Sequence, residues 1–225
     1  NRIVLYLAKT EFADNEALPA SLRALLSSIF EVRFVDDLRS HKKYFYAFRE
    51  FPDAIVITAD DDILYPPHLI KGLLASWQRH PHAVSAARAH TIVMREDGTF
   101  APYAEWMEAP RVINRPSFLV MPTGAGGILY PPKCFSEALF DWETIQKTCL
   151  RADDLWLKWH ELERNVPCVY VPRLWSGRTT EGSQACALWN HNGSHEEAQT
   201  ETPNERAWRL IMEARRPQSE TIRLC

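Results

Sequence analysis

The chain has 225 residues, of which 46% are hydrophobic and 24% are charged. These values are typical of a single globular domain and exclude a disordered or collagen-like chain. Its 26 Lys and Arg residues and 29 Asp and Glu residues give a formal net charge of −3, so we expect no nucleic-acid partner, because there is no overall positive field to attract one.

The longest apolar runs, such as Ile3–Ala8, have about six residues, whereas roughly 20 are needed to cross a bilayer, so we expect no membrane span. The N-terminus lacks the cleavage pattern of a secretory signal and an initiator Met, which suggests a fragment of a longer chain. Five cysteines, none of them in a Cys-x-x-Cys pair, favour neither a disulfide framework nor a structural zinc site. A reducing, cytoplasmic location is the best match to these features.

Strands and helices are predicted to alternate over the first ninety residues. Short apolar runs indicate strands, and apolar side chains at i, i+3, i+4 and i+7 indicate helices. The predicted elements are a strand at 3–7, a helix from about Pro19 to Ile29, a strand around 32–34, a helix at 44–50, a strand at 54–58, a helix around 69–77 and a strand at 84–88. The run at 54–58 is apolar enough for a central strand buried on both faces. This alternation predicts an α/β fold with a mainly parallel sheet flanked by helices.

The pattern is less regular in the second half of the chain. Prolines and glycines are frequent from 91 to 132, so loops and short strands are expected there. Asp153 and Asp154 are predicted to begin a helix, followed by a strand at 166–171 and a last helix around Trp208. The polar segment 175–203 predicts a flexible loop. No repeat or linker divides the chain, so a single domain is expected over 1–225.

The strongest functional signal is the run Asp60-Asp61-Asp62, which follows the predicted strand at 54–58. Ligands of parallel α/β sheets bind outside the carboxyl ends of the strands. Adjacent ionised carboxylates repel each other, and Mn²⁺ or Mg²⁺ would offset that charge together with substrate phosphates. Asp60 and Asp62 would point to the same side of an extended segment, so they are the candidate metal ligands. The alternative is a solvated loop that caps the next helix.

A glycine-rich segment, Gly124–Pro132, is the second signal. Its glycines, with Gly126 and Gly127 foremost, would let the backbone approach a sugar or a phosphate closely. The spacing matches neither a P-loop nor a dinucleotide-binding fingerprint, and a plain turn is an equally open interpretation.

The third signal is the pair Asp153-Asp154 at the start of a predicted helix. Backbone N–H groups and the helix dipole favour an ionised carboxylate at that position. Such a carboxylate can deprotonate a hydroxyl group that attacks an electrophilic carbon, provided that it lies within hydrogen-bond reach. Ordinary N-capping of the helix is the alternative.

Several residues give weaker signals, each with a structural alternative. Lys42 and Lys43 could contact phosphate or form a solvated pair, and Arg88 and His90 could reach the same sheet edge as the acidic run. The remaining candidates are His191 and His195 as late metal ligands, and Trp106 and Trp189 as platforms for a sugar ring.

These segments, in this order, resemble a bacterial glycosyltransferase of the GT-A fold, of the kind found in lipopolysaccharide and capsule biosynthesis. The matching segments are 3–12, 37–44, 60–66, 124–132 and 152–158, within roughly the first 160 residues. The resemblance implies a GT-A, Rossmann-like domain in which 1–90 form the donor and metal half and 91–225 form the acceptor half, with a mobile C-terminal loop. Such enzymes usually begin with a strand and a helix that hold the nucleotide base, so we expect that first base-binding strand to be missing here.

The resemblance also implies roles for individual residues. In that family an Asp-x-Asp element binds Mn²⁺ or Mg²⁺ bridging a nucleotide-sugar diphosphate, which places this role on Asp60 and Asp62, with Asp61 adjoining. An acidic pair near the acceptor supplies the base of inverting members, here Asp153-Asp154, with Asp154 favoured. The implied activity is inverting transfer of a hexose from a nucleotide sugar to a saccharide or lipid-linked acceptor. The implied location is the cytoplasm, with peripheral association at the inner face of the plasma membrane.

Two other functions stay open at this point. A metal-dependent phosphohydrolase also uses an Asp-x-Asp element at a strand end, but there the first Asp is closely followed by Thr or Ser, whereas Asp62 is followed by Ile63. A saccharide-binding module without turnover would use the same acids and tryptophans. Phosphate release from simple esters would favour the first, and sugar binding that ignores metal and nucleotide would favour the second.

Overall fold

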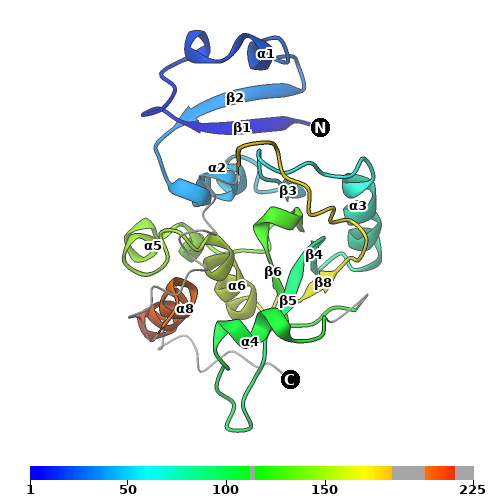
Figure 1. Cartoon of the computed structure of the whole chain (residues 1–225), viewed down its shortest axis with the longest axis vertical. Coiled ribbons are helices and arrows are strands. Elements are labelled where there is room, and N and C mark those ends of the chain that lie inside the picture. Colours follow the sequence, from blue (N-terminus) through cyan, green and yellow to red (C-terminus); the bar gives the residue numbers. More distant parts are fainter. Residues whose placement is uncertain (112–114, 184–200, 216–225) are drawn as a thin grey trace.

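The structure is a computed structural model that describes residues 1–111, 115–183 and 201–215 (Figure 1). Its strands are β1 (Ile3–Ala8), β2 (Phe30–Val35), β3 (Val56–Thr58), β4 (Val84–Ala86), β5 (Ala89–Thr91), β6 (Val120–Pro122), β7 (Ile128–Tyr130) and β8 (Cys168–Tyr170). Its α-helices are α1 (Ala20–Arg23), α2 (Lys42–Glu50), α3 (Leu69–Arg79), α4 (Tyr103–Glu108), α5 (Trp142–Thr148), α6 (Asp153–Glu163) and α8 (Pro203–Ala214). Within these ranges, no helix has the length and apolar character that a bilayer span requires.

The fold is α/β, but its sheets are small and mixed, so the prediction of one mainly parallel sheet was wrong. β1 and β2 form a parallel pair, β5 and β6 an antiparallel pair, and the largest sheet has four strands in the order β3-β7-β4-β8. In that sheet only β4 and β8 are parallel, because β7 runs antiparallel to both of its neighbours. β3 lies at the end of this sheet, not at its centre as predicted.

The four-stranded sheet separates two hydrophobic layers because successive side chains of a strand point to opposite faces. On β7, Ile128 and Tyr130 belong to the core that includes α6, whereas Leu129 belongs to the core beneath α3. Cys168 and Val169 on β8 divide in the same way. Figure 1 accordingly shows α3 on one side of the sheet and α6 on the other.

The first two strands form a separate layer that α2 joins to the rest of the molecule (Figure 1). Tyr6 of β1, Val35 of β2 and Ala47 of α2 make a small core of their own, against which Val56 of β3 packs. Because α2 touches both β1 and β3, its first turn is held beside the end of β3. This arrangement brings the lysines of α2 toward the acidic run.

The helix predicted from Pro19 to Ile29 was also wrong. Only Ala20–Arg23 are α-helical, and Leu25 and Ile29 are 63% and 58% exposed. The apolar spacing was present, but no neighbouring element covers that face, and isolated helical turns are marginal without such packing.

Candidate functional site

The acidic run lies at the end of β3, and a tyrosine connects it to the glycine-rich turn. The N–H of Asp60 donates a hydrogen bond to the Tyr65 hydroxyl (2.9 Å), which donates to the carbonyl of Ala125 (3.0 Å). Tyr65 therefore connects the acidic run to the glycine-rich turn through two hydrogen bonds. Sequence analysis did not assign it a role, although its place three residues after the last acid was visible.

The acidic pair begins α6, as predicted. Asp153 is buried, and Asp154 is partly exposed. An Oδ1 atom of Asp154 accepts a hydrogen bond from the N–H of Gly124 (2.9 Å), so the helix start is joined to the glycine-rich turn. A Cβ on Gly124 would lie 2.8 Å from that oxygen and 2.6 Å from Nζ of Lys43, which explains why no side chain is tolerated there.

Lys43 joins these segments electrostatically. Its ammonium lies 2.9 Å from Oδ1 of Asp60 and 3.1 Å from Oδ2 of Asp153, so one cation from α2 bridges the end of β3 and the start of α6. The Lys43 side chain is only 21% exposed, and that of Asp153 only 9%. The three sequence signals and Lys43 therefore form one cluster, which we call the Lys43 site: Lys43, Asp60, Asp61, Asp62, Asp153, Asp154 and Gly124.

The pKa values of Asp153 and Asp154, the two acids that begin α6, are shifted in opposite directions. Burial would raise the pKa of Asp153, but the charges of Lys43 and His41, together with hydrogen bonding to its carboxylate, hold that pKa below its ordinary value. Burial, followed by the negative charge of Asp153, raises the pKa of Asp154 to about 7. Burial alone would lower the pKa of Lys43, but Asp153 and Asp60 together hold it well above its usual value. The site thus pairs a fixed anion with a carboxyl group that titrates near neutrality, as a general base requires.

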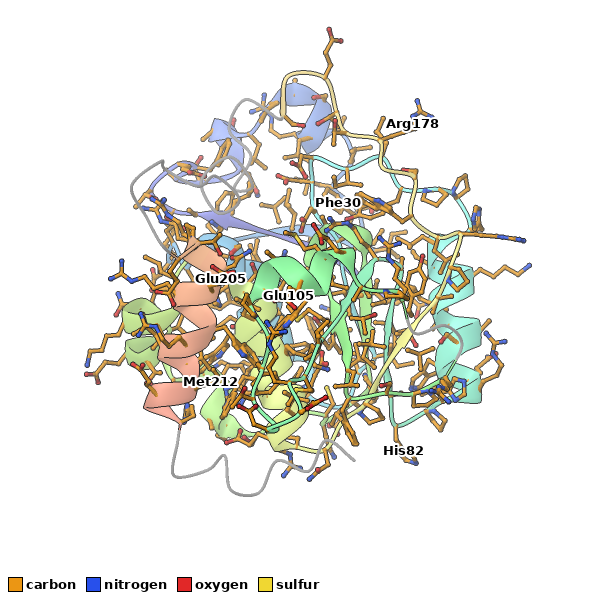
Figure 2. All side chains as sticks on the ribbon, turned by 60° about the horizontal axis from the view of Figure 1, so that its bottom comes forward. Phe30, His82, Glu105, Arg178, Glu205 and Met212 are labelled. Atoms are coloured by element: carbon orange, nitrogen blue, oxygen red, sulfur yellow. The ribbon has the colours of Figure 1, made fainter. Side chains whose placement is uncertain are left out.

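A segment that follows β8 holds the end of the acidic run in place. The N–H of Thr180 donates to the carbonyl of Asp62 (2.8 Å), and the N–H of Leu64 donates to the carbonyl of Arg178 (2.9 Å). Figure 1 shows this yellow-to-orange segment running from β8 past α3, and Figure 2 shows Arg178 projecting away from it. The pairing orders the backbone of Asp62, and no sequence pattern could have predicted a contact between such distant segments.

Asp62 forms no ion pair with a Lys or Arg side chain of the described residues. Burial raises its pKa above the ordinary value, and the negative charges of Asp60 and Asp61 raise it further. The positive charge of Lys43 lowers the pKa of Asp62, but this effect is smaller than each of the effects that raise it. An additional cation at this position would therefore stabilise the ionised form of Asp62.

The remaining glycines of the turn allow close backbone packing. A Cβ on Gly126 would lie 2.6 Å from the backbone nitrogen of Arg88, and Gly127 has a φ of +87°. Gly126 and Gly127 are both buried. They shape the turn against Arg88 and Tyr65 instead of presenting an open surface, so the expectation that they contact the substrate is not supported by their surroundings.

The two lysines have different surroundings. Lys42, also expected to contact phosphate, is paired with Asp37 (2.9 Å), which also pairs with Arg39 (3.2 Å). Lys43 is the counter-ion described above, not a solvated side chain. Arg88 and His90 lie at the end of β4 and on β5, across the Gly124–Gly126 turn from the acidic run, where Arg88 Nη1 donates to the Thr123 hydroxyl (2.9 Å).

The expectation for Trp106 was wrong. Its ring is fully buried and packs edge-on against Trp208 of α8 at 5.4 Å between ring centroids, so it cannot stack on a sugar. Its indole N–H donates to the carbonyl of Ala101 (3.0 Å). The other candidates of this kind, His191, His195 and Trp189, lie outside the described residues.

The described residues contain no group of three or more His, Cys, Asp or Glu side chains arranged to hold a metal ion by themselves. The prediction required only Asp60 and Asp62, with phosphate and water oxygens completing the shell, as is common for Mg²⁺. Their hard oxygen donors, and the lack of a Lys or Arg ion pair for Asp62 among the described residues, match that requirement. Comparison with known proteins adds nothing further: no protein-family model matches the chain, and neither a curated protein nor a solved structure is significantly similar to it.

Proposed function

We propose that the protein is a metal-dependent glycosyltransferase that moves a hexose from a nucleotide sugar to a saccharide or lipid-linked acceptor. The observation on which this proposal depends most is that Lys43 joins Asp60 to Asp153. The acidic run, the glycine-rich turn and the start of α6 are far apart in the sequence, yet they meet at one place. These are three of the segments on which the resemblance to GT-A glycosyltransferases rests.

Asp60 and Asp62 would hold Mn²⁺ or Mg²⁺ together with the diphosphate of the donor. When bound, the ion would offset the negative charge that develops on the departing nucleoside diphosphate. Lys43 donates a hydrogen bond to Oδ1 of Asp60 and so holds that oxygen in place. Asp61 is exposed and forms no ion pair with Lys43, so we assign it a supporting electrostatic role only.

Asp154 would act as the general base. Its ionised carboxylate accepts the proton of the acceptor hydroxyl while that oxygen forms a bond to the anomeric carbon, and the bond between this carbon and the phosphate oxygen breaks with its electron pair. Asp153 is buried and paired with Lys43, so it acts as a positioning residue and not as the base. A displacement of this kind inverts the anomeric centre.

Asp62→Ala tests the metal-binding part of the proposal. We expect it to weaken binding of the cognate nucleotide sugar in Mn²⁺ at least tenfold, because one of the two ligands is lost. The measurement is calorimetric titration of a nucleotide-sugar panel, with Mn²⁺ and with EDTA. Asp61→Ala is the matched control, since it removes a neighbouring charge from an exposed position, and it should change the affinity less than threefold.

Two outcomes of that titration would reject the proposal. If Asp62→Ala binds the donor as tightly as the wild type in Mn²⁺, the acidic run does not hold the ion. If the wild type binds simple saccharides equally well with Mn²⁺ and with EDTA, the protein is a saccharide-binding module. Phosphate release from simple phosphate esters, with no transfer of sugar, would identify a phosphohydrolase instead.

The acceptor's chemistry suggests where such an enzyme works. Surface polysaccharides are assembled on lipid-linked intermediates, so we propose a cytoplasmic enzyme with peripheral association at the inner face of the plasma membrane. Fractionation of cells that express the protein tests this proposal, and recovery in the culture medium would contradict it.

A further inference from the structure

Two arginines adjoin Ala89 at the start of β5, and neither has a carboxylate partner among the described residues. In the described part of the chain, no Asp or Glu oxygen lies within 4.0 Å of a guanidinium nitrogen of Arg88 or Arg111. Arg88 donates to Thr123 and lies over the ring of Trp175 at 5.8 Å, and Arg111 Nε donates to the carbonyl of Ala89 (3.0 Å). Hydrogen bonds therefore hold both arginine side chains in place, and no carboxylate of the described residues pairs with either guanidinium group.

A buried histidine, His90, follows directly after Ala89 on β5. His90 is only 7% exposed, and its Nδ1 has no hydrogen-bond partner. Burial, together with the positive charges of Arg88 and Arg111, lowers the pKa of His90 to about 4. An unpartnered ring nitrogen beside two cations costs free energy unless a ligand satisfies it.

Arg88 is connected to the proposed base through the glycine-rich turn, because it donates to the Thr123 hydroxyl and the N–H of the next residue, Gly124, donates to Asp154. Tyr103 on α4 packs edge-on against His90 at 6.1 Å between ring centroids. Burial raises the pKa of Tyr103, the charge of Asp154 raises it further and the charge of Arg88 lowers it, so Tyr103 lies within reach of both groups. By contrast, the charges that act on Asp62 are those of Asp60, Asp61 and Lys43.

We propose that Arg88, His90 and Arg111 form a subsite for an anionic group, a phosphate or a carboxylate, on the acceptor. This inference rests on the proposed function, because it names the acceptor class of the same site. The planar guanidinium groups match the two oxygens of a carboxylate or phosphate, and such contacts are strongest where the group is partly buried. Binding the anion at this subsite would hold the acceptor next to Asp154.

The test follows the His90 ring resonances by long-range ¹H–¹⁵N NMR, with assignment by His90→Gln. The wild type is titrated with inorganic phosphate and, separately, with sodium acetate, each against chloride at equal ionic strength. We expect saturable shifts of the His90 resonances with at least one of the two anions, and the stronger one identifies the group on the acceptor. Arg111→Gln should weaken that binding at least tenfold. Arg95→Gln is the control, because Arg95 is an arginine that already pairs with a carboxylate, Glu105 (2.6 Å), and it should have no effect.

A second measurement tests whether the arginines bind the acceptor or the nucleotide-sugar donor. Arg111→Gln should bind the nucleotide sugar in Mn²⁺ within twofold of the wild type by calorimetry. A tenfold loss would place the donor diphosphate at the arginines and overturn the assignment to the acceptor. Equal effects of phosphate, acetate and chloride on His90 would overturn the subsite itself. If no nucleotide sugar binds to the wild type, the proposed function fails, and the phosphate titration alone then decides whether an anion subsite exists.

Discussion

Asp154→Asn is expected to abolish sugar transfer while leaving donor binding intact. The loss should be about 10²–10⁴-fold in the rate of transfer, the range over which a general base contributes. The amide oxygen of Asn can still accept the hydrogen bond that Gly124 donates to Oδ1, so the glycine-rich turn should keep its position. Transfer assays on the variant, paired with calorimetry of donor binding, measure the two effects separately.

The same variant should be more stable than the wild type at alkaline pH. The pKa of Asp154 is about 7 in the folded protein, above the value near 3.9 of an unfolded chain. The stability that comes from protonated Asp154 is therefore full below about pH 4 and is lost as the pH rises through about 7. Since Asp154 is partly exposed and coupled to Asp153, we expect a gain of about 1–3 kcal/mol at pH 8, and none at pH 4.

The pH dependence of the wild-type rate provides a further check on Asp154. The rate should fall as the pH drops below 7, because only the ionised carboxylate accepts a proton. Full transfer activity in Asp154→Asn, or a wild-type rate that is flat between pH 5 and 8, would reject Asp154 as the base. A variant that loses activity and stability together would instead indicate a structural role.

Lys43→Met is expected to cause the largest loss of stability among the variants at the site. It would leave the buried carboxylate of Asp153 without its cation and Asp60 without its hydrogen bond. Removing one partner of a buried ion pair typically costs 3–5 kcal/mol, and we expect about 2–4 kcal/mol here because Lys43 is 21% exposed. Urea unfolding at pH 7.5 measures the difference.

The sign of the pH effect for Lys43→Met is opposite to that for Asp154→Asn. Lys43 holds the pKa of Asp153 below its ordinary value, so this stability is present above the unfolded pKa and is lost as the pH falls through the folded one. The deficit of Lys43→Met should therefore be full at neutral pH and shrink as the pH falls below about 4. Lys42→Met is the matched control, because Arg39 still pairs with Asp37 when Lys42 is gone, and it should cost about 1 kcal/mol or less. Equal losses of stability in Lys43→Met and Lys42→Met would show that the ion pair between Lys43 and Asp153 contributes no more to stability than the more exposed pair between Lys42 and Asp37.

The local elements of the fold were predictable from the sequence, but their assembly was not. The predicted strands at 3–7 and 166–171 and the helix at 69–77 are present as β1, β8 and α3, since each has a periodic apolar face that a neighbour covers. The insertion of β7 between β3 and β4 was not predictable, because strand direction depends on pairing between distant segments. α4 and α5 were missed as well, since prolines and loops around them obscure the short helical pattern.

For the candidate site, too, individual residues could be chosen from the sequence, but their contacts could not be predicted. Asp60, Asp62, Asp153 and Asp154 were chosen for their residue type and their place at the ends of predicted elements. The structure brings Asp60 and Asp153 to one ammonium, and Asp154 beside them to the glycine-rich turn. The role of Lys43 was not predictable, because adjacent lysines are equivalent in the sequence and only the docking of α2 distinguishes Lys43 from Lys42. Trp106 failed as a candidate because its burial depends on α8, which lies about a hundred residues farther along the chain.

The coupling between Mn²⁺ and a nucleoside diphosphate tests most directly whether the acidic run holds an ion against a pyrophosphate. Free Mn²⁺ is measured by electron paramagnetic resonance while it is titrated into the wild type, alone and with the nucleoside diphosphate of the cognate donor. We predict that the diphosphate tightens Mn²⁺ binding at least tenfold in the wild type, beyond its own affinity for the ion, and that Asp62→Ala loses this gain. Identical Mn²⁺ affinity with and without the diphosphate in the wild type would contradict the account.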